Sequence, residues 1–182
     1  MRRALGLFTI PIAPMPSWLP IDPPFEIVLV SPQIPPNTGN VARTCAVTGS
    51  PLHLVAPLGF SLEEKQLRRA GLDYWKDVSL RVWASWAEFE AGMVRGQTKR
   101  LHLFTARDGR DLAQANFSPG DFLVFGHEQL GLPPALVAAH PERRVVIPML
   151  EGKRSLNLAV AVGVGLYAAL FSVRSGGADR LG

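Results

Sequence analysis

The sequence predicts an α/β domain with a mostly parallel β-sheet flanked by helices. Short apolar runs alternate with longer helical segments along most of the 182 residues, and such alternation is typical of β-α-β units. The composition is that of a globular protein, since 47% of the residues are hydrophobic and 19% are charged. A chain of this length is expected to form one domain.

Six apolar runs are predicted to be strands. The first, residues 25–30, is largely apolar, as expected of a strand buried on both faces. The other five are residues 52–55, 78–83, 101–105, 122–125 and 145–147. Ligands of parallel sheets bind beyond the carboxyl ends of the strands. The loops after Val30, Thr105, Phe125 and Ile147 are therefore the candidate binding loops.

Start and stop signals place helices between these strands. Asn37 or Thr38 is the predicted N-cap of a helix over residues 38–48, and Gly49 ends it. Ser85 and Glu88 have the spacing of a capping box and open a later helix. The remaining helices are predicted over residues 62–70, from residue 133, and over residues 155–173.

The ends of the chain differ from its middle. Six prolines and no hydrophobic period mark residues 1–24 as a flexible leader outside the fold. The domain is predicted to span residues 25–175, and residues 176–182 form a short flexible tail.

Charge and cysteine content limit the partners and the compartment. A formal net charge of +4 favours an anionic partner such as a phosphate backbone, although many soluble proteins are mildly basic. Cys45 is the only cysteine, so an internal disulfide is excluded and no cysteine–histidine cluster suggests a metal. Prolines interrupt the apolar start, and residues 158–171 are too short to span a bilayer. We expect a cytoplasmic protein without a membrane partner.

The first candidate motif is residues 34–43, which connect a predicted strand to the start of a predicted helix. Exposed backbone N–H groups at such a point favour anions. Arg43 follows within the helix, and its guanidinium can bind a phosphate through two hydrogen bonds. The alternative is an ordinary capped helix start with a solvated arginine.

The second candidate motif is residues 123–133. Gly126 directly after a strand permits close approach of a ligand to the backbone. Glu128 is a candidate general base or an RNA-facing carboxylate, or it accepts hydrogen bonds from loop or helix-start amides. The glycine spacing is not that of a dinucleotide-binding loop, which disfavours a Rossmann-type oxidoreductase.

The third candidate motif is residues 145–158, a strand followed by an irregular loop and the start of a helix. Ser155 is explained as an ordinary N-cap. Asn157 is not explained in this way, because a polar amide that enters a core needs hydrogen-bond partners. We expect a ligand to be one source of those partners.

Together these stretches resemble the three motifs of the SPOUT-class RNA ribose methyltransferases, and the nearest resemblance is to the small tRNA (cytidine(34)-2′-O)-methyltransferases. The matching residues are 34–35, 37–40 and 43 in the first motif, 125–126, 128 and 131–133 in the second, and 147–149 and 154–158 in the third. The resemblance implies a deep C-terminal trefoil knot and a homodimer. It also implies S-adenosylmethionine as methyl donor, no metal, and the ribose of the wobble nucleotide of tRNA as target, cytidine or modified uridine, with leucine tRNAs as the expected substrates.

The resemblance also assigns roles to individual residues. Arg43 is expected to help activate the ribose hydroxyl, and Asn157 to support the site. The residues expected to hold the cofactor are Phe104, Gly126, Ile147, Met149, Ser155 and Leu156. Those expected to contact RNA are Lys65, Arg68, Arg69 and Glu128. The first three lie at positions i, i+3 and i+4 and share one face of a predicted helix. The alternative is that this is an ordinary solvated helix face without RNA contacts.

The sequence departs from the family pattern at Leu130, Ala159 and Ala168, where close relatives carry polar residues. These departures concern RNA contacts and the dimer surface more than cofactor binding. Two alternatives therefore stay open. One is an RNA-binding relative without activity, and the other is a 2′-O-methyltransferase that acts on another RNA site.

Overall fold

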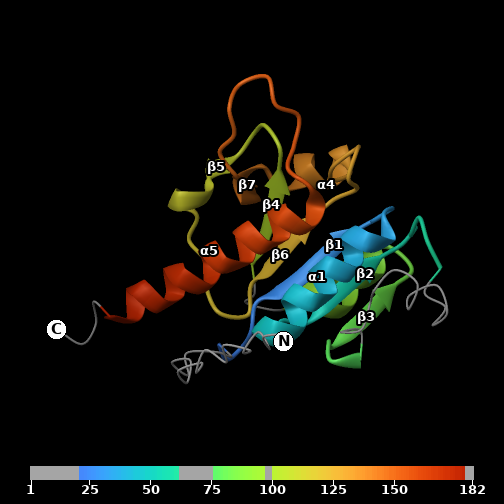
Figure 1. The fold of residues 1–182 in the computed structure, drawn as a ribbon, viewed down its shortest axis with the longest axis horizontal. Coiled ribbons are helices and arrows are strands. Elements are labelled where there is room, and N and C mark those ends of the chain that lie inside the picture. Colours follow the sequence, from blue (N-terminus) through green and yellow to red (C-terminus); the bar gives the residue numbers. More distant parts are fainter. Residues whose placement is uncertain (1–20, 62–75, 97–99, 179–182) are drawn as a thin grey trace, which may run out of the picture.

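The computed structural model describes residues 21–61, 76–96 and 100–178 as seven parallel strands and their flanking helices (Figure 1). The strands are β1 (Glu26–Val30), β2 (Leu52–Val55), β3 (Leu80–Trp83), β4 (Leu101–Thr105), β5 (Arg110–Asp111), β6 (Phe122–Phe125) and β7 (Arg144–Val146). Their order in the sheet is β3-β2-β1-β6-β4-β7-β5, and every pairing is parallel. The parallel α/β sheet predicted from the sequence is confirmed.

The centre of the sheet is buried on both faces. All residues of β1, β2 and β6 are buried, which explains why these strands are almost continuously apolar in sequence. In register, Val28 of β1 lies between His53 of β2 and Val124 of β6. Alternate residues then face opposite layers, so Ile27 joins one hydrophobic cluster and Val28 joins the other.

Helices cover both faces of this sheet. Helices α1 (Pro35–Thr48) and α5 (Leu158–Ala178) pack on one face and lie next to each other in Figure 1. Helices α3 (Trp86–Phe89) and α4 (Pro134–Ala139) contribute Phe89 and Leu136 to the cluster on the other face. Ser85 caps α3 as predicted, because its hydroxyl accepts a hydrogen bond from the Glu88 N–H at 3.2 Å.

The starts of α1 and α5 differ from the prediction. Helix α1 begins at Pro35 with Ile34 as N-cap, so Asn37 and Thr38 lie inside its first turn. Proline suits this start because the first turn needs no N–H donor within the helix. Helix α5 begins at Leu158 rather than Ser155. Asn157 caps it, since Asn157 Oδ1 accepts hydrogen bonds from the backbone N–H groups of residues 159 and 160.

Two strands near one edge of the sheet also differ from the prediction. Strand β7 ends at Val146, one residue before the predicted end, and starts one residue earlier. Strand β5 was not predicted. It has only two residues, both exposed, so it lacks the apolar signal on which strand prediction depends.

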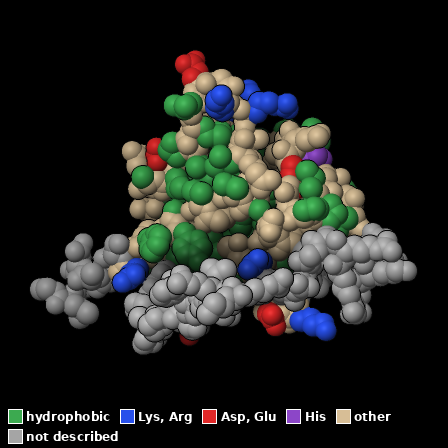
Figure 2. Space-filling view, viewed as in Figure 1, with side chains coloured by type: hydrophobic (Ala, Val, Ile, Leu, Met, Phe, Trp, Pro, Cys, Tyr) green, Lys and Arg blue, Asp and Glu red, His purple; other side chains and the backbone are tan. Residues whose placement is uncertain are grey.

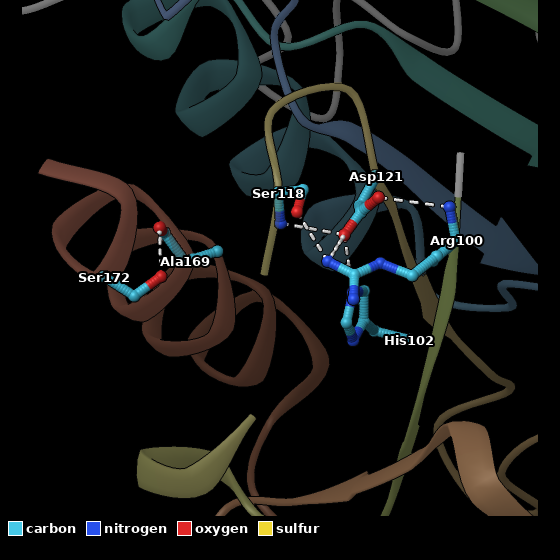
Figure 3. Close-up of polar contacts among 6 residues, drawn as sticks. All are labelled: Arg100, His102, Ser118, Asp121, Ala169 and Ser172. Atoms are coloured by element: carbon cyan, nitrogen blue, oxygen red, sulfur yellow. Dashed lines mark hydrogen bonds and ion pairs between the residues drawn. The ribbon is translucent and has the colours of Figure 1, made fainter. Parts of the chain in front are cut away.

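A buried carboxylate ties together the amino ends of β4 and β6 (Figure 3). Asp121 is 2% exposed, and it accepts hydrogen bonds from the backbone N–H groups of Arg100 at 3.1 Å and Ser118 at 2.9 Å. His102 Nε2 lies 2.9 Å from the same carboxylate, and the Arg100 guanidinium forms an ion pair with it. This cluster lies at the opposite end of the strands from their candidate binding loops.

Several predicted features lie outside the described residues. Lys65, Arg68 and Arg69, with their predicted helix, fall in the segment 62–75, and most of the leader falls in residues 1–20. Ile21 is described and packs against the cluster between the sheet and α5. Helix α5 continues to Ala178, beyond the predicted domain end at residue 175. Within the described part of the chain, no helix is both long and apolar enough to cross a membrane.

Candidate active site

A cleft of about 1130 Å³ opens at the carboxyl ends of β4, β6 and β7. Its walls are the loops that follow these three strands together with the start of α5. Strand ends in parallel sheets leave such a crevice because successive crossover connections diverge there. Three of the four predicted binding loops, those after Thr105, Phe125 and Ile147, therefore border one space.

The structure brings all six residues predicted to hold the cofactor to this cleft. They are Phe104, Gly126, Ile147, Met149, Ser155 and Leu156. The rings of Phe104 and Phe125 stack with centroids 4.3 Å apart, and they form an apolar floor. Gly165 of α5 lets the helix approach this floor, because a Cβ at that position would lie 2.8 Å from the Phe104 ring.

A tight turn forms one rim of the cleft. The backbone N–H of His127 donates to the carbonyl of Gly131 at 3.1 Å, and the Gly131 N–H donates back at 2.8 Å. Gly131 has φ of +72°, which glycine adopts without strain. A Cβ on Gly126 would collide with the backbone of Gly131, so the turn folds back onto the strand end only because residue 126 is glycine.

Glu128 of this turn binds the start of α1 rather than facing solvent. Its carboxylate accepts hydrogen bonds from the backbone N–H groups of Gln33 at 2.9 Å and Ile34 at 3.0 Å. The side-chain amide of Asn37 donates a third at 3.1 Å. Partial burial opposes ionisation, but these hydrogen bonds outweigh it and lower the pKa of Glu128 below its ordinary value. The anion at this helix start is therefore the protein's own carboxylate.

Asn37 and Asn157 extend this contact to the third motif. Asn157 Nδ2 donates a hydrogen bond to Asn37 Oδ1 at 2.9 Å, while Asn157 Oδ1 caps α5. The hydrogen bonds run in one direction, from Asn157 to Asn37 to Glu128, so neither amide can flip without losing a bond. The partners that Asn157 requires thus include groups of the chain itself. Sequence reasoning had not singled out Asn37 as the link between the motifs, although each motif supplies one member.

Three of the predicted catalytic and RNA-binding residues are described by the structure, and they differ in their relation to the cleft. Arg43 lies exposed on α1 and is not one of the residues that line the cleft. Glu128 does line it. Asn157 is exposed beside the start of α5, next to the lining residue Leu158. The structure therefore joins Asn157 and Glu128 through Asn37, and Arg43 is not among the residues that line the cleft.

The cleft is bordered by cationic and apolar side chains. Arg107, Arg144 and Arg154 line it, and Arg144 forms an ion pair with Asp108. Figure 2 shows lysine and arginine side chains at the end that carries the loop between β7 and α5, above hydrophobic side chains on the face of α1 and α5. The described residues contain no group of three or more histidine, cysteine, aspartate or glutamate side chains that could hold a metal ion.

Comparisons with known proteins agree with this geometry. The model of the SpoU rRNA Methylase family matches residues 24–167. The tRNA (cytidine(34)-2′-O)-methyltransferase of Burkholderia pseudomallei (strain 1106a) is 49% identical over 146 residues, which cover 80% of this chain and 93% of that protein. The enzyme of the same name from Methylovorus glucosotrophus (strain SIP3-4) is 47% identical over 146 residues, with the same coverage of 80% and 93%.

Solved structures show the same similarity. One, from work on the 2-OH methylation of C/U34 on tRNA, has a TM-score of 0.76 at 48% identity and covers 83% of this chain and 97% of that one. The AdoMet-bound rRNA methyltransferase from Sinorhizobium meliloti has a TM-score of 0.68 at 22% identity, with coverage of 80% and 55%. At that identity the second comparison supports the fold alone.

Proposed function

The chain belongs to the SpoU rRNA Methylase family, and from that premise we propose that it methylates the 2′-hydroxyl of the wobble nucleotide of tRNA in the cytoplasm. The methyl donor is S-adenosylmethionine, and the target is cytidine or modified uridine at position 34. Leucine tRNAs are the expected substrates. The relative at 49% identity carries the name of this activity. The observation that carries the proposal is the meeting of all six expected cofactor residues on one cleft.

The cleft has the chemistry that the methyl donor requires. Its volume of about 1130 Å³ suffices for a nucleoside-sized ligand, and the stacked rings of Phe104 and Phe125 offer an apolar surface for a purine. Gly126 lets the turn that borders the cleft pack against the end of β6, because a Cβ there would meet the backbone of Gly131 and Leu132. When bound, S-adenosylmethionine supplies an electrophilic methyl group on a sulfonium that departs as a neutral thioether, so the chemistry needs no metal.

The protein's part in the reaction is to orient the ribose and to favour loss of its hydroxyl proton. The hydrogen bonds among Glu128, Asn37 and Asn157 hold three loops at fixed separation, and such positioning lowers the barrier to an in-line transfer. The Arg43 guanidinium stabilises the negative charge that develops on the ribose oxygen, and an RNA phosphate is the group that accepts the hydroxyl proton. If an Arg43→Ala variant kept full turnover with saturating tRNA, this role would be wrong.

The proposed functional unit is a homodimer. Helices α1 and α5 expose apolar side chains to solvent, and these are Val47, Val160, Val164 and Phe171. A second copy of the chain is the proposed occupant, because side chains of this kind are rarely left in contact with water along a helix pair. Light scattering after gel filtration should give twice the chain mass of 19.8 kDa. A monomer that is fully active would contradict the proposal.

Methyl transfer separates the proposed function from its rivals. Purified protein is incubated with radiolabelled S-adenosylmethionine and total tRNA, and acid-precipitable label is counted. We expect label in tRNA from the wild-type protein. Binding of S-adenosylmethionine without transfer to any RNA would indicate a relative without activity. The incubation is repeated with ribosomal RNA in place of tRNA, and transfer to ribosomal RNA alone would indicate a different RNA site.

A further inference from the structure

Leu130 is displayed to solvent at the rim of the cleft. Its side chain is 80% exposed, whereas Leu132, two residues later, is 7% exposed and packs in the core. Scattered exposed leucines are ordinary on protein surfaces. This one differs because it lines the cleft that holds the expected cofactor residues.

The turn that carries Leu130 is held in place by its own hydrogen bonds. His127 and Gly131 exchange two backbone hydrogen bonds across it. The imidazole Nδ1 of His127 accepts hydrogen bonds from the N–H groups of Gln129 at 3.0 Å and Leu130 at 3.4 Å. Glu128 then fastens the turn to the start of α1. The exposure of Leu130 is therefore imposed by an ordered turn.

The position of this turn limits what can contact Leu130. The reacting ribose must lie at the mouth of the cleft, and its base is attached to the same sugar. Two arginines that line the cleft, Arg107 and Arg154, suit the phosphates on either side of that nucleotide, whereas Arg144 is paired with Asp108. Proteins that bind single-stranded RNA combine cationic groups for the backbone with side chains that pack on the bases, and this cleft is lined by both arginines and Leu130.

We propose that Leu130 packs against the base of the nucleotide whose ribose is methylated. This inference rests on the proposed function and adds to it the contact that holds the target base. An aliphatic side chain packs on the flat face of a base through dispersion contacts and forms no hydrogen bond to its edge. Leu130 therefore contributes affinity for the splayed-out nucleotide without selecting between the two bases.

The test combines a Leu130→Ser variant with an RNA that lacks the base at the target nucleotide but keeps its ribose. On intact RNA we expect kcat/KM to fall about tenfold, as for the loss of a weak base-stacking contact. On the abasic RNA the kcat/KM of the wild-type protein should also be about tenfold lower than on intact RNA. The kcat/KM of the variant should be no lower on the abasic RNA than on the intact RNA. The affinity for S-adenosylmethionine should be unchanged.

Matched variants make the result specific. Leu150→Ser removes a leucine that is 79% exposed on another loop, and it should leave kcat/KM within about twofold of wild type. Leu130→Met keeps an apolar contact and should retain most activity. The abasic site is placed at whichever nucleotide the wild-type protein labels, so failure of the proposed function is seen first, as absence of labelling.

Two outcomes would overturn the inference. If Leu130→Ser lowered kcat/KM about tenfold relative to wild type on the intact RNA and equally on the abasic RNA, Leu130 would contact something other than the base. If the variant instead changed the mass of the protein in solution, a second copy of the chain would be its partner.

Discussion

The carboxylate of Glu128 accepts a hydrogen bond from the side-chain amide of Asn37 at 3.1 Å, although 91 positions separate the two residues. This contact joins the turn after β6 to the first turn of α1. Because Asn37 also accepts a hydrogen bond from Asn157, two contacts made by Asn37 connect all three motifs. The geometry of the cleft rim therefore depends on a few polar groups whose removal can be tested.

Replacing Glu128 by glutamine should weaken this connection. The amide cannot accept charge-assisted hydrogen bonds from Gln33 and Ile34, and one of its donors would face them. Because the site is partly exposed, we expect a loss of about 1 kcal/mol in the free energy of unfolding. Urea denaturation measures it. Glu142→Gln, at an exposed residue, should leave the free energy of unfolding nearly unchanged; an equal loss in both variants would contradict the role of Glu128.

Substitutions at Asn157 separate its two hydrogen-bonding roles. Asn157→Asp keeps an oxygen to cap α5 but cannot donate to Asn37. Asn157→Ala loses both, and the lost cap should cost about 1 kcal/mol. We therefore expect the aspartate variant to unfold near the wild-type temperature, yet to lose about tenfold or more in kcat, because small misplacements are costly. Full activity of the aspartate variant would show that the bond to Asn37 has no catalytic importance.

Gly126 should tolerate no side chain. A Cβ there would collide with the backbone of Gly131 and Leu132 rather than with a movable side chain. Gly126→Ala should therefore destabilise the protein by about 1–3 kcal/mol and weaken binding of S-adenosylmethionine. Calorimetry of binding and thermal unfolding measure the two effects. Gly163→Ala is the control, since nothing lies within 4 Å of its added Cβ; it should be stabilising by up to about 1 kcal/mol in a helix.

Asp121 should make stability depend on acid pH. Burial opposes its ionisation, but hydrogen bonds from His102 and from the backbone of Arg100 and Ser118 lower its pKa below the ordinary value. A carboxyl group whose pKa is lower in the folded protein than in the unfolded chain stabilises the fold when it is ionised. This stabilisation is complete above the unfolded pKa of about 3.9 and is lost as the pH falls through the folded pKa. Urea unfolding from pH 5 downward should show this loss, expected below about pH 4. Asp121→Asn should flatten the profile, and an unchanged profile would contradict the assignment.

The sequence predicted the central strands better than the helix starts, for a physical reason. Strands such as β1 and β6 are buried on both faces and are apolar throughout, a signal that is local in the chain. The start of α1 is set by Pro35 and by Glu128, which is remote in sequence, so local capping rules selected Asn37 instead. Strand β5 is exposed and short, and it carries no apolar signal.

The candidate site was predictable in part. The resemblance to the family is confirmed, and it identified the six residues that meet on the cleft. The roles of those six, of Arg43 and of Lys65, Arg68 and Arg69 stay predictions, as does the knot. Asn37 was missed as the link because hydrogen bonds between segments more than 90 positions apart leave no local pattern. The linking role of Asn37 follows only from the contacts of the folded chain.

The central claim is tested most directly by locating the methyl group on the RNA. Leucine tRNA without modification at position 34 is incubated with the protein and S-adenosylmethionine, digested, and analysed by mass spectrometry for the methylated nucleotide. We predict one added methyl group on the ribose of nucleotide 34. A methyl group on a base, or at any other nucleotide with position 34 unmodified, would contradict the account.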